Sequence, residues 1–258
     1  MGRERRAEPD LPYVPRSYRS TRSEACVLWT SYHEVGDHRA CLQAWIHDAA
    51  GFLSRVLAFQ PHRRLHVVSF LTNEEARRAL DRQIPATMAL APYAGENACL
   101  IVVQSANTSP ENGVPDRMRG VLVHEVAHQR IAERTGSRKA LGDGNRSMNV
   151  STWLNEGLAE LLRWWFLEDA VRIAAAEAAF RGADSSLTWS ELGDRLDDLD
   201  DERRGEAFTQ AAGATAWLAR KVGIRRLFDR LPDVDRIVPS SEPCAVEALA
   251  AALCLFAL

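Results

Sequence analysis

The strand patterns of this chain end near residue 105, and the regular patterns after that point are helical. Before it, short runs rich in Val, Leu and Ile alternate with segments whose apolar residues recur at helical spacing. The expected strands are 25–32, 65–71 and 99–105 with a weaker one at 86–91, and the expected helices of this half are 37–59 and 73–83. Strands mixed with helices, followed by helices alone, predict an α+β fold.

A loop rich in turn residues at 106–115 separates the two halves. The helices expected beyond it are 116–135, 153–173, 207–223 and 224–231, followed by a last apolar segment at 245–258. We therefore expect a small mixed sheet with helices in an N-terminal lobe, and a C-terminal lobe that is mostly helical.

The expected domain covers residues 25–231, with an α/β lobe at 25–115 and a helical lobe at 116–231. Residues 1–24 are charged and contain proline, which indicates a flexible N-terminal tail. Prolines separate residues 232–258 from the rest, and we expect this segment to form a C-terminal helical tail.

The composition is that of a globular protein, with 46% hydrophobic and 26% charged residues. A net charge of -3 and a pI near 6.2 argue against a nucleic-acid partner. No segment approaches the roughly 18 consecutive apolar residues of a membrane helix, so no membrane partner is expected. The chain begins without the apolar core of a secretory signal, and its five cysteines form no C-x-x-C pair. We expect buried free thiols and a cytoplasmic protein.

One expected helix carries the pattern H-E-x-x-H, as His124, Glu125, Val126, Ala127 and His128. Residues four apart on a helix lie on one face, so both imidazoles can reach one metal ion at about 2.0 to 2.1 Å. Glu125 lies beside that face, where it can take a proton from a water on the metal. Two histidines can also fall four apart by chance. The apolar surroundings favour a metal, because buried imidazoles without a partner are costly.

A catalytic zinc needs a third protein ligand and one open coordination position. No histidine follows His128, and the only later cysteines, Cys244 and Cys254, lie near the C-terminus. A carboxylate is therefore expected, and the start of the next helix offers Glu156 and Glu160.

Glu156 and Glu160 are four residues apart and share a helix face. One can ligate the metal while the other accepts the free ring N–H of a ligand histidine. We assign Glu156 as the third ligand, and Glu160 and Asn155 as side chains that hold the ligands in place. The alternative is a pair of solvated helix carboxylates. The apolar flanks, among them Trp153 and Leu158, argue against it.

The two segments together, H-E-V-A-H-Q and W-L-N-E-G-L-A-E, resemble those of the gluzincin metallopeptidases. The likeness is to the bacterial peptidase-MA-like domains related to the M1 aminopeptidases, and it extends over about residues 25–231. It implies a zincin-like fold with one zinc ion (Zn2+) per chain, in the cleft between the lobes. The implied ligands are His124, His128 and Glu156. It also implies Glu125 as general base, and a peptide or protein as substrate.

Two features depart from that family. The spacing from His128 to Glu156 is longer than in the family, which a longer loop between two helices can accommodate. The family's transition-state tyrosine has Phe208 in the comparable position, and every tyrosine of this chain lies at or before Tyr93. Loss of such a hydroxyl donor commonly costs about 10² to 10³ in rate. A second interpretation is therefore a zinc-bearing but catalytically weak domain that binds peptides or a partner protein.

A fainter resemblance lies just before the strand expected at 99–105. The stretch Gly95, Glu96, Asn97 is similar to the aminopeptidase segment whose glutamate holds the amino terminus of the substrate. Glu96 is therefore a candidate substrate-binding residue, and the alternative is a polar turn before a strand. No sequence feature indicates an oligomeric state.

Overall fold

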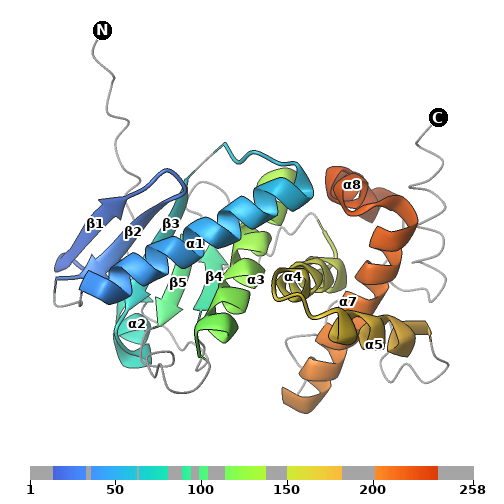
Figure 1. Ribbon diagram of the computed structural model, residues 1–258. Coiled ribbons are helices and arrows are strands. Elements are labelled where there is room, and N and C mark those ends of the chain that lie inside the picture. The colour runs from blue at the N-terminus through green and yellow to red at the C-terminus, as the bar shows by residue number, and fades with distance from the viewer. Residues whose placement is uncertain are drawn as a thin grey trace, which may run out of the picture.

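The computed structural model describes eight stretches of the chain (Figure 1). These are residues 14–32, 36–62, 64–80, 89–93, 99–103, 114–137, 150–181 and 201–237. Within them the fold is α+β, as the sequence predicts: a mixed sheet formed by the first half, and helices alone after residue 114.

The sheet has five described strands in the order β1-β2-β3-β5-β4. Their bounds are β1 Tyr18–Arg22, β2 Cys26–Ser31, β3 Leu65–Phe70, β4 Ala89–Tyr93 and β5 Cys99–Val103. The three central strands β2, β3 and β5 are parallel, and β1 and β4 are antiparallel edge strands. The central strands are apolar on both sides because helices cover both faces of a parallel region.

Alternate residues of the central strands divide between two apolar clusters. Leu65 and Val67 of β3 point to the larger cluster, with α1 (Gly36–Leu57) and α3 (Val114–Thr135). Val68 and Phe70 point to a smaller cluster that includes residues of α2 (Asn73–Leu80). In Figure 1, α1 lies across one face of the sheet and α3 stands at its edge.

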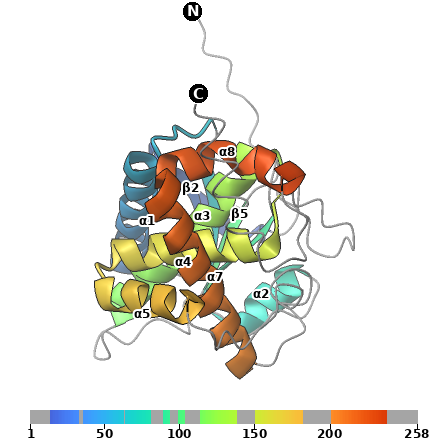
Figure 2. The same ribbon diagram turned by 90° about the vertical axis from the view of Figure 1, so that its right-hand side faces the viewer.

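In the helical half, α3 is followed by α4 (Thr152–Phe166), α5 (Ala170–Arg181), α7 (Asp201–Val222) and α8 (Ile224–Ile237). Figure 2 shows α7 crossing both α4 and α5 on the side of α3 away from the sheet. Buried residues of α3, α4, α7 and α8 belong to the same cluster that covers the sheet, so one apolar core runs through both halves.

The structure corrects the expected limits in several places. The helix expected at 207–223 is α7, which already begins at Asp201. β1 lies inside the segment 1–24 that was expected to be a flexible tail, and it pairs with β2 along its whole length. The helix expected at 153–173 is broken between α4 and α5, where Glu168 has a φ of 55° and the Asp169 side chain accepts the backbone N–H of Arg172. α8 continues past residue 231 because Pro232 is accommodated inside the helix.

Two further expectations concern cysteines and membranes. Cys26 is a buried free thiol as expected, whereas Cys41 is free but exposed, because it faces outward on α1. Within the described stretches, we find no helix with the length and apolar content needed to cross a membrane.

Candidate metal centre

The three predicted ligands come together where α3 meets α4. His124 and His128 project from α3, and Glu156 projects from the start of α4. The two Nε2 atoms are 3.0 Å apart, and Glu156 Oε2 lies 3.4 Å from that of His124 and 3.2 Å from that of His128. In the part of the chain that the structure describes, they are the one group of three or more His, Cys, Asp or Glu side chains that could hold a metal ion.

The two Nε2 atoms and Glu156 Oε2 form a triangle whose size fits a tetrahedrally coordinated ion. Ligand atoms at about 2.0 to 2.1 Å from a zinc ion lie about 3.3 to 3.4 Å from one another at the tetrahedral angle. The three sides of 3.0, 3.2 and 3.4 Å are within a few tenths of an ångström of that value. The side chains therefore need little adjustment to bind an ion at their centre.

The second nitrogen of each imidazole is held by a side chain of α4. His124 Nδ1 lies 3.0 Å from Glu160 Oε2, and His128 Nδ1 lies 3.1 Å from Asn155 Oδ1. Since both partners are oxygen acceptors, each Nδ1 carries a proton, and Nε2 is the nitrogen that offers a lone pair to a cation once any proton on it is displaced. Two lone pairs and a carboxylate oxygen then face one point, an arrangement that a cation stabilises. Glu160 and Asn155 therefore lie against the two histidine rings.

The close approach of α4 and α7 helps to fix this site. Gly157 follows the ligand Glu156, and a Cβ at this position would overlap the backbone carbonyl of Ala211 in α7. The absence of a side chain lets the two helix backbones touch. It also brings Phe208, one turn before Ala211, to the edge of the metal centre.

The charges around the ligands favour a cation. Burial lowers the pKa of His124, but its hydrogen bonds to Glu156 and Glu160 and the nearby carboxylate charges raise it to about 10. Burial raises the pKa of Glu156 and Glu160, yet both values stay below the usual range, because His128 and His124 lower the pKa of Glu156, and His124 and Arg163 lower that of Glu160. Both carboxylates are therefore ionised beside the two imidazoles, and the site attracts positive charge.

Glu125 lies next to this group without belonging to it. Its side chain is partly exposed, and its negative charge contributes to the raised pKa of His124. A carboxylate near the ligands and partly exposed to solvent is a candidate base for a water at the centre.

Phe208 also lies at the centre. Its ring centroid is 6.5 Å from that of His124, and the two rings meet edge to face at 77°. The position compared with the family's tyrosine is therefore adjacent to a predicted ligand. The side chain it offers there has no hydroxyl group.

One contact at the centre was missed from the sequence. Arg163 Nη1 donates to both carboxylate oxygens of Glu160, at 3.1 and 3.2 Å. The spacing Glu160-x-x-Arg163 on a helix is a signal that could have identified this pair. The candidate substrate residue Glu96 lies outside the described residues.

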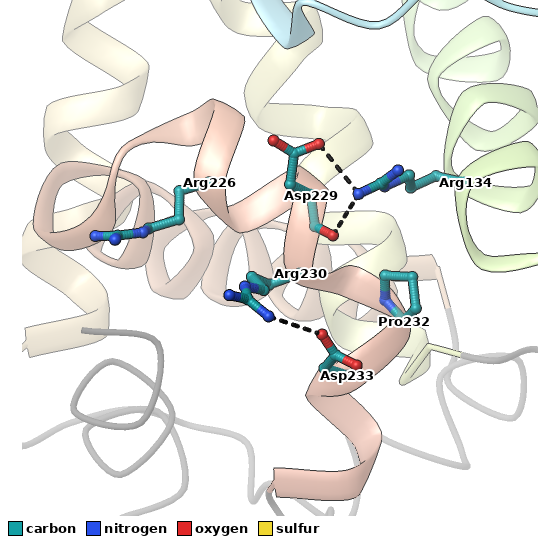
Figure 3. Close-up of a pocket in the computed structure, with 6 residues that line it drawn as sticks. All are labelled: Arg134, Arg226, Asp229, Arg230, Pro232 and Asp233. Carbon is teal, nitrogen blue, oxygen red and sulfur yellow. Dashed lines mark hydrogen bonds and ion pairs between the residues drawn. The ribbon is translucent and has the colours of Figure 1, made fainter. Parts of the chain in front are cut away.

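A separate hollow lies at the C-terminal end of α3 against α8 (Figure 3). Its polar lining is mostly paired: Arg134 contacts the carboxylate and the backbone carbonyl of Asp229, and Arg230 contacts Asp233. Arg226 points away from the other side chains in Figure 3. The guanidinium groups do not converge on one point, so this hollow is a weaker candidate for chemistry than the metal centre.

Comparison of the sequence with protein-family models finds no family that matches the chain. A comparison with curated proteins finds no relative. The resemblance to the gluzincins therefore depends on the two motifs and on the geometry described above.

Proposed function

We propose that this protein is a zinc-dependent peptidase. The observation that carries the proposal is the convergence of His124 Nε2, His128 Nε2 and Glu156 Oε2, while both Nδ1 atoms are held by other acceptors. Two nitrogens and one carboxylate oxygen, in a triangle of tetrahedral size, are the protein ligands of a catalytic zinc with one open position.

Each residue then has a definite role. When bound, zinc supplies a water with its pKa lowered to about 7 and polarises the carbonyl of the substrate. Glu125 takes a proton from the attacking water and delivers it to the leaving amine. Glu160 and Asn155 hold the ligand rings in the tautomer that the site requires.

Exchange of Glu125 for glutamine tests this proposal. Glu125→Gln is expected to keep about one zinc per chain and to lose hydrolysis, because an amide cannot accept the proton. The measurement is a digest of a peptide library by both proteins, read by mass spectrometry, beside their zinc contents. Cleavage that persists undiminished in Glu125→Gln would exclude Glu125 as the base.

A second candidate function is supported by Phe208. A metal centre at which position 208 offers a phenyl ring without a hydroxyl beside His124 suits a zinc-bearing domain that binds a peptide or a partner protein and cleaves weakly. Zinc at one per chain together with no cleavage of any library peptide would favour this function. Cleavage that Glu125→Gln abolishes would exclude it.

We also propose a reducing compartment, the cytoplasm, for this chain. Cys26 and Cys41 are free thiols in the structure, as is usual in proteins of that compartment. Alkylation of the thiols during cell lysis, followed by mass spectrometry, is expected to find both reduced.

A further inference from the structure

Glu160 connects the metal centre to a charged side chain that no motif assigns. Its Oε2 accepts the Nδ1–H of His124 at 3.0 Å, while both its oxygens accept from Arg163 at 3.1 and 3.2 Å. Glu160 is 10% exposed and Arg163 is 24% exposed, so solvent competes little for these contacts. A chain of three side chains therefore runs from the ligand ring to the guanidinium.

The position of Arg163 is set by packing against α3. A Cβ at Gly120 would lie 3.3 Å from Arg163 Nε and 3.4 Å from its Cγ. Gly120 stands one turn before His124, so the arginine stem crosses α3 directly beside the ligand. Among the described residues, Arg163 Nε is buried and has no hydrogen-bond partner. The hydrogen bonds of this guanidinium are those from Nη1 to the Glu160 carboxylate.

We propose that Arg163 is a positioning residue for the metal centre. By binding both oxygens of Glu160, it fixes the plane of that carboxylate and thereby the orientation of the His124 ring. Arg163 itself touches no ligand, so its effect on the metal passes through Glu160. This inference rests on the proposed function only in requiring that the centre holds zinc.

The test is the zinc affinity of Arg163→Met, measured by competition with a chromophoric chelator. Methionine keeps an apolar stem of similar length and removes the charged donor. The expected result is a loss of about tenfold, the lower end of what disturbing the partners of metal ligands costs. Melting of the metal-free proteins in chelator checks that the variant is folded. If Arg163→Met is not folded, Arg163→Gln serves in its place with the same expectation.

Arg119→Met is the matched control. Arg119 also lies between α3 and α4, pairs with Asp116 and Asp48, and stacks on Phe166, but it contacts neither Glu160 nor a ligand in any described interaction. Its zinc affinity is expected to equal that of the wild type. An equal loss in both variants would overturn the proposal, because the effect would then belong to helix packing in general.

A double-mutant cycle tests whether Arg163 acts through Glu160. In a Glu160→Gln background, Arg163→Met is expected to have no further effect on zinc affinity. The same tenfold loss in that background, or wild-type affinity of Arg163→Met alone, would overturn the proposal. A wild-type chain that binds no zinc would refute both the proposed function and this inference. The outcomes named above would overturn the role of Arg163 alone, so the two kinds of failure can be told apart.

Discussion

The metal centre depends on how each histidine ring is held. In His124 and His128, Nδ1 is held by a side-chain oxygen of α4, so Nε2 is the nitrogen that can offer its lone pair to a metal ion. Glu156 completes the triangle from the same helix that supplies Glu160 and Asn155. The orientation of these two rings on α3 thus depends on four side chains of α4, which are Asn155, Glu156, Glu160 and Arg163.

Phe208→Tyr is the most informative change at the residue scale. The ring at this position meets His124 edge to face, so the added hydroxyl would belong to a ring adjacent to a predicted ligand. If the chain hydrolyses peptides, the variant is expected to raise kcat by about tenfold or more, because one hydroxyl donor to a developing oxyanion is commonly worth about 10² to 10³. The measurement is kcat for a cleaved library peptide, with both proteins at equal zinc content.

Phe180→Tyr is the control for that change. Phe180 packs against Trp217 on another side of α7, so an added hydroxyl there is expected to leave kcat unchanged. A kcat for Phe208→Tyr no higher than that of the wild type would show that position 208 does not face the reacting carbonyl.

The residues of the centre were largely predictable from the sequence. His124 and His128 follow from helical spacing, and Glu160 follows from its spacing to Glu156. Asn155 and Glu160 were assigned as supports, but which of them holds which ring depends on how α3 and α4 cross. That geometry is tertiary, and no pattern within one helix contains it. Arg163 was missed because an i,i+3 ion pair usually lies on a solvated surface.

At the scale of elements, the junction of α4 and α7 is the most constrained contact near the centre. Gly157→Ala places a Cβ against the backbone of Ala211, which cannot rotate away. We expect this variant to lower the free energy of unfolding of the metal-free chain by about 1 to 3 kcal/mol, as overpacking commonly does. The measurement is urea unfolding in the presence of a chelator.

Gly205→Ala is the matched control on α7. Among the described residues, no atom beyond the local helix backbone and the two chain neighbours lies within 4 Å of a Cβ built at Gly205, so alanine adds helix propensity without a clash there. Its free energy of unfolding is expected to rise by up to about 1 kcal/mol. Equal effects of the two substitutions would contradict the close contact at Gly157.

Most elements with clear apolar periodicity were predicted near their observed limits, whereas β1 and the break between α4 and α5 were not predicted. β1 has one buried apolar residue, Tyr18, among polar ones, so its pairing with β2 leaves no alternating pattern. The break between α4 and α5 depends on Glu168 at positive φ, a conformation that its residue type does not signal.

At the scale of the whole molecule, the metal centre lies at the contact of α3 with α4, the first two helices after the sheet. α3 packs on α1 beside the sheet and on α4 in the helical half, and the ligands span the α3–α4 contact. The α+β class was predictable from the order of patterns. The strand order was not, because β5 inserts between β3 and β4 through contacts between distant segments.

A bound metal should therefore stabilise the whole fold. An ion that binds only the folded chain raises its stability by mass action, by about 4 kcal/mol at a thousandfold excess over Kd. Zinc is expected to raise the melting temperature of the metal-free protein, and a chelator to reverse the rise. Calorimetry with magnesium in place of zinc is the control, because magnesium prefers oxygen ligands in octahedral geometry and should leave the melting temperature unchanged.

The central claim is that His124, His128 and Glu156 bind one zinc ion. The most direct test is the zinc content of the purified chain after incubation with zinc and removal of the excess, measured by mass spectrometry of the metal. About one zinc per wild-type chain is expected, and far less in His128→Ala, which lacks one of the three ligand atoms. A wild-type chain that retains no zinc, or a His128→Ala chain that retains as much as the wild type, would contradict the account.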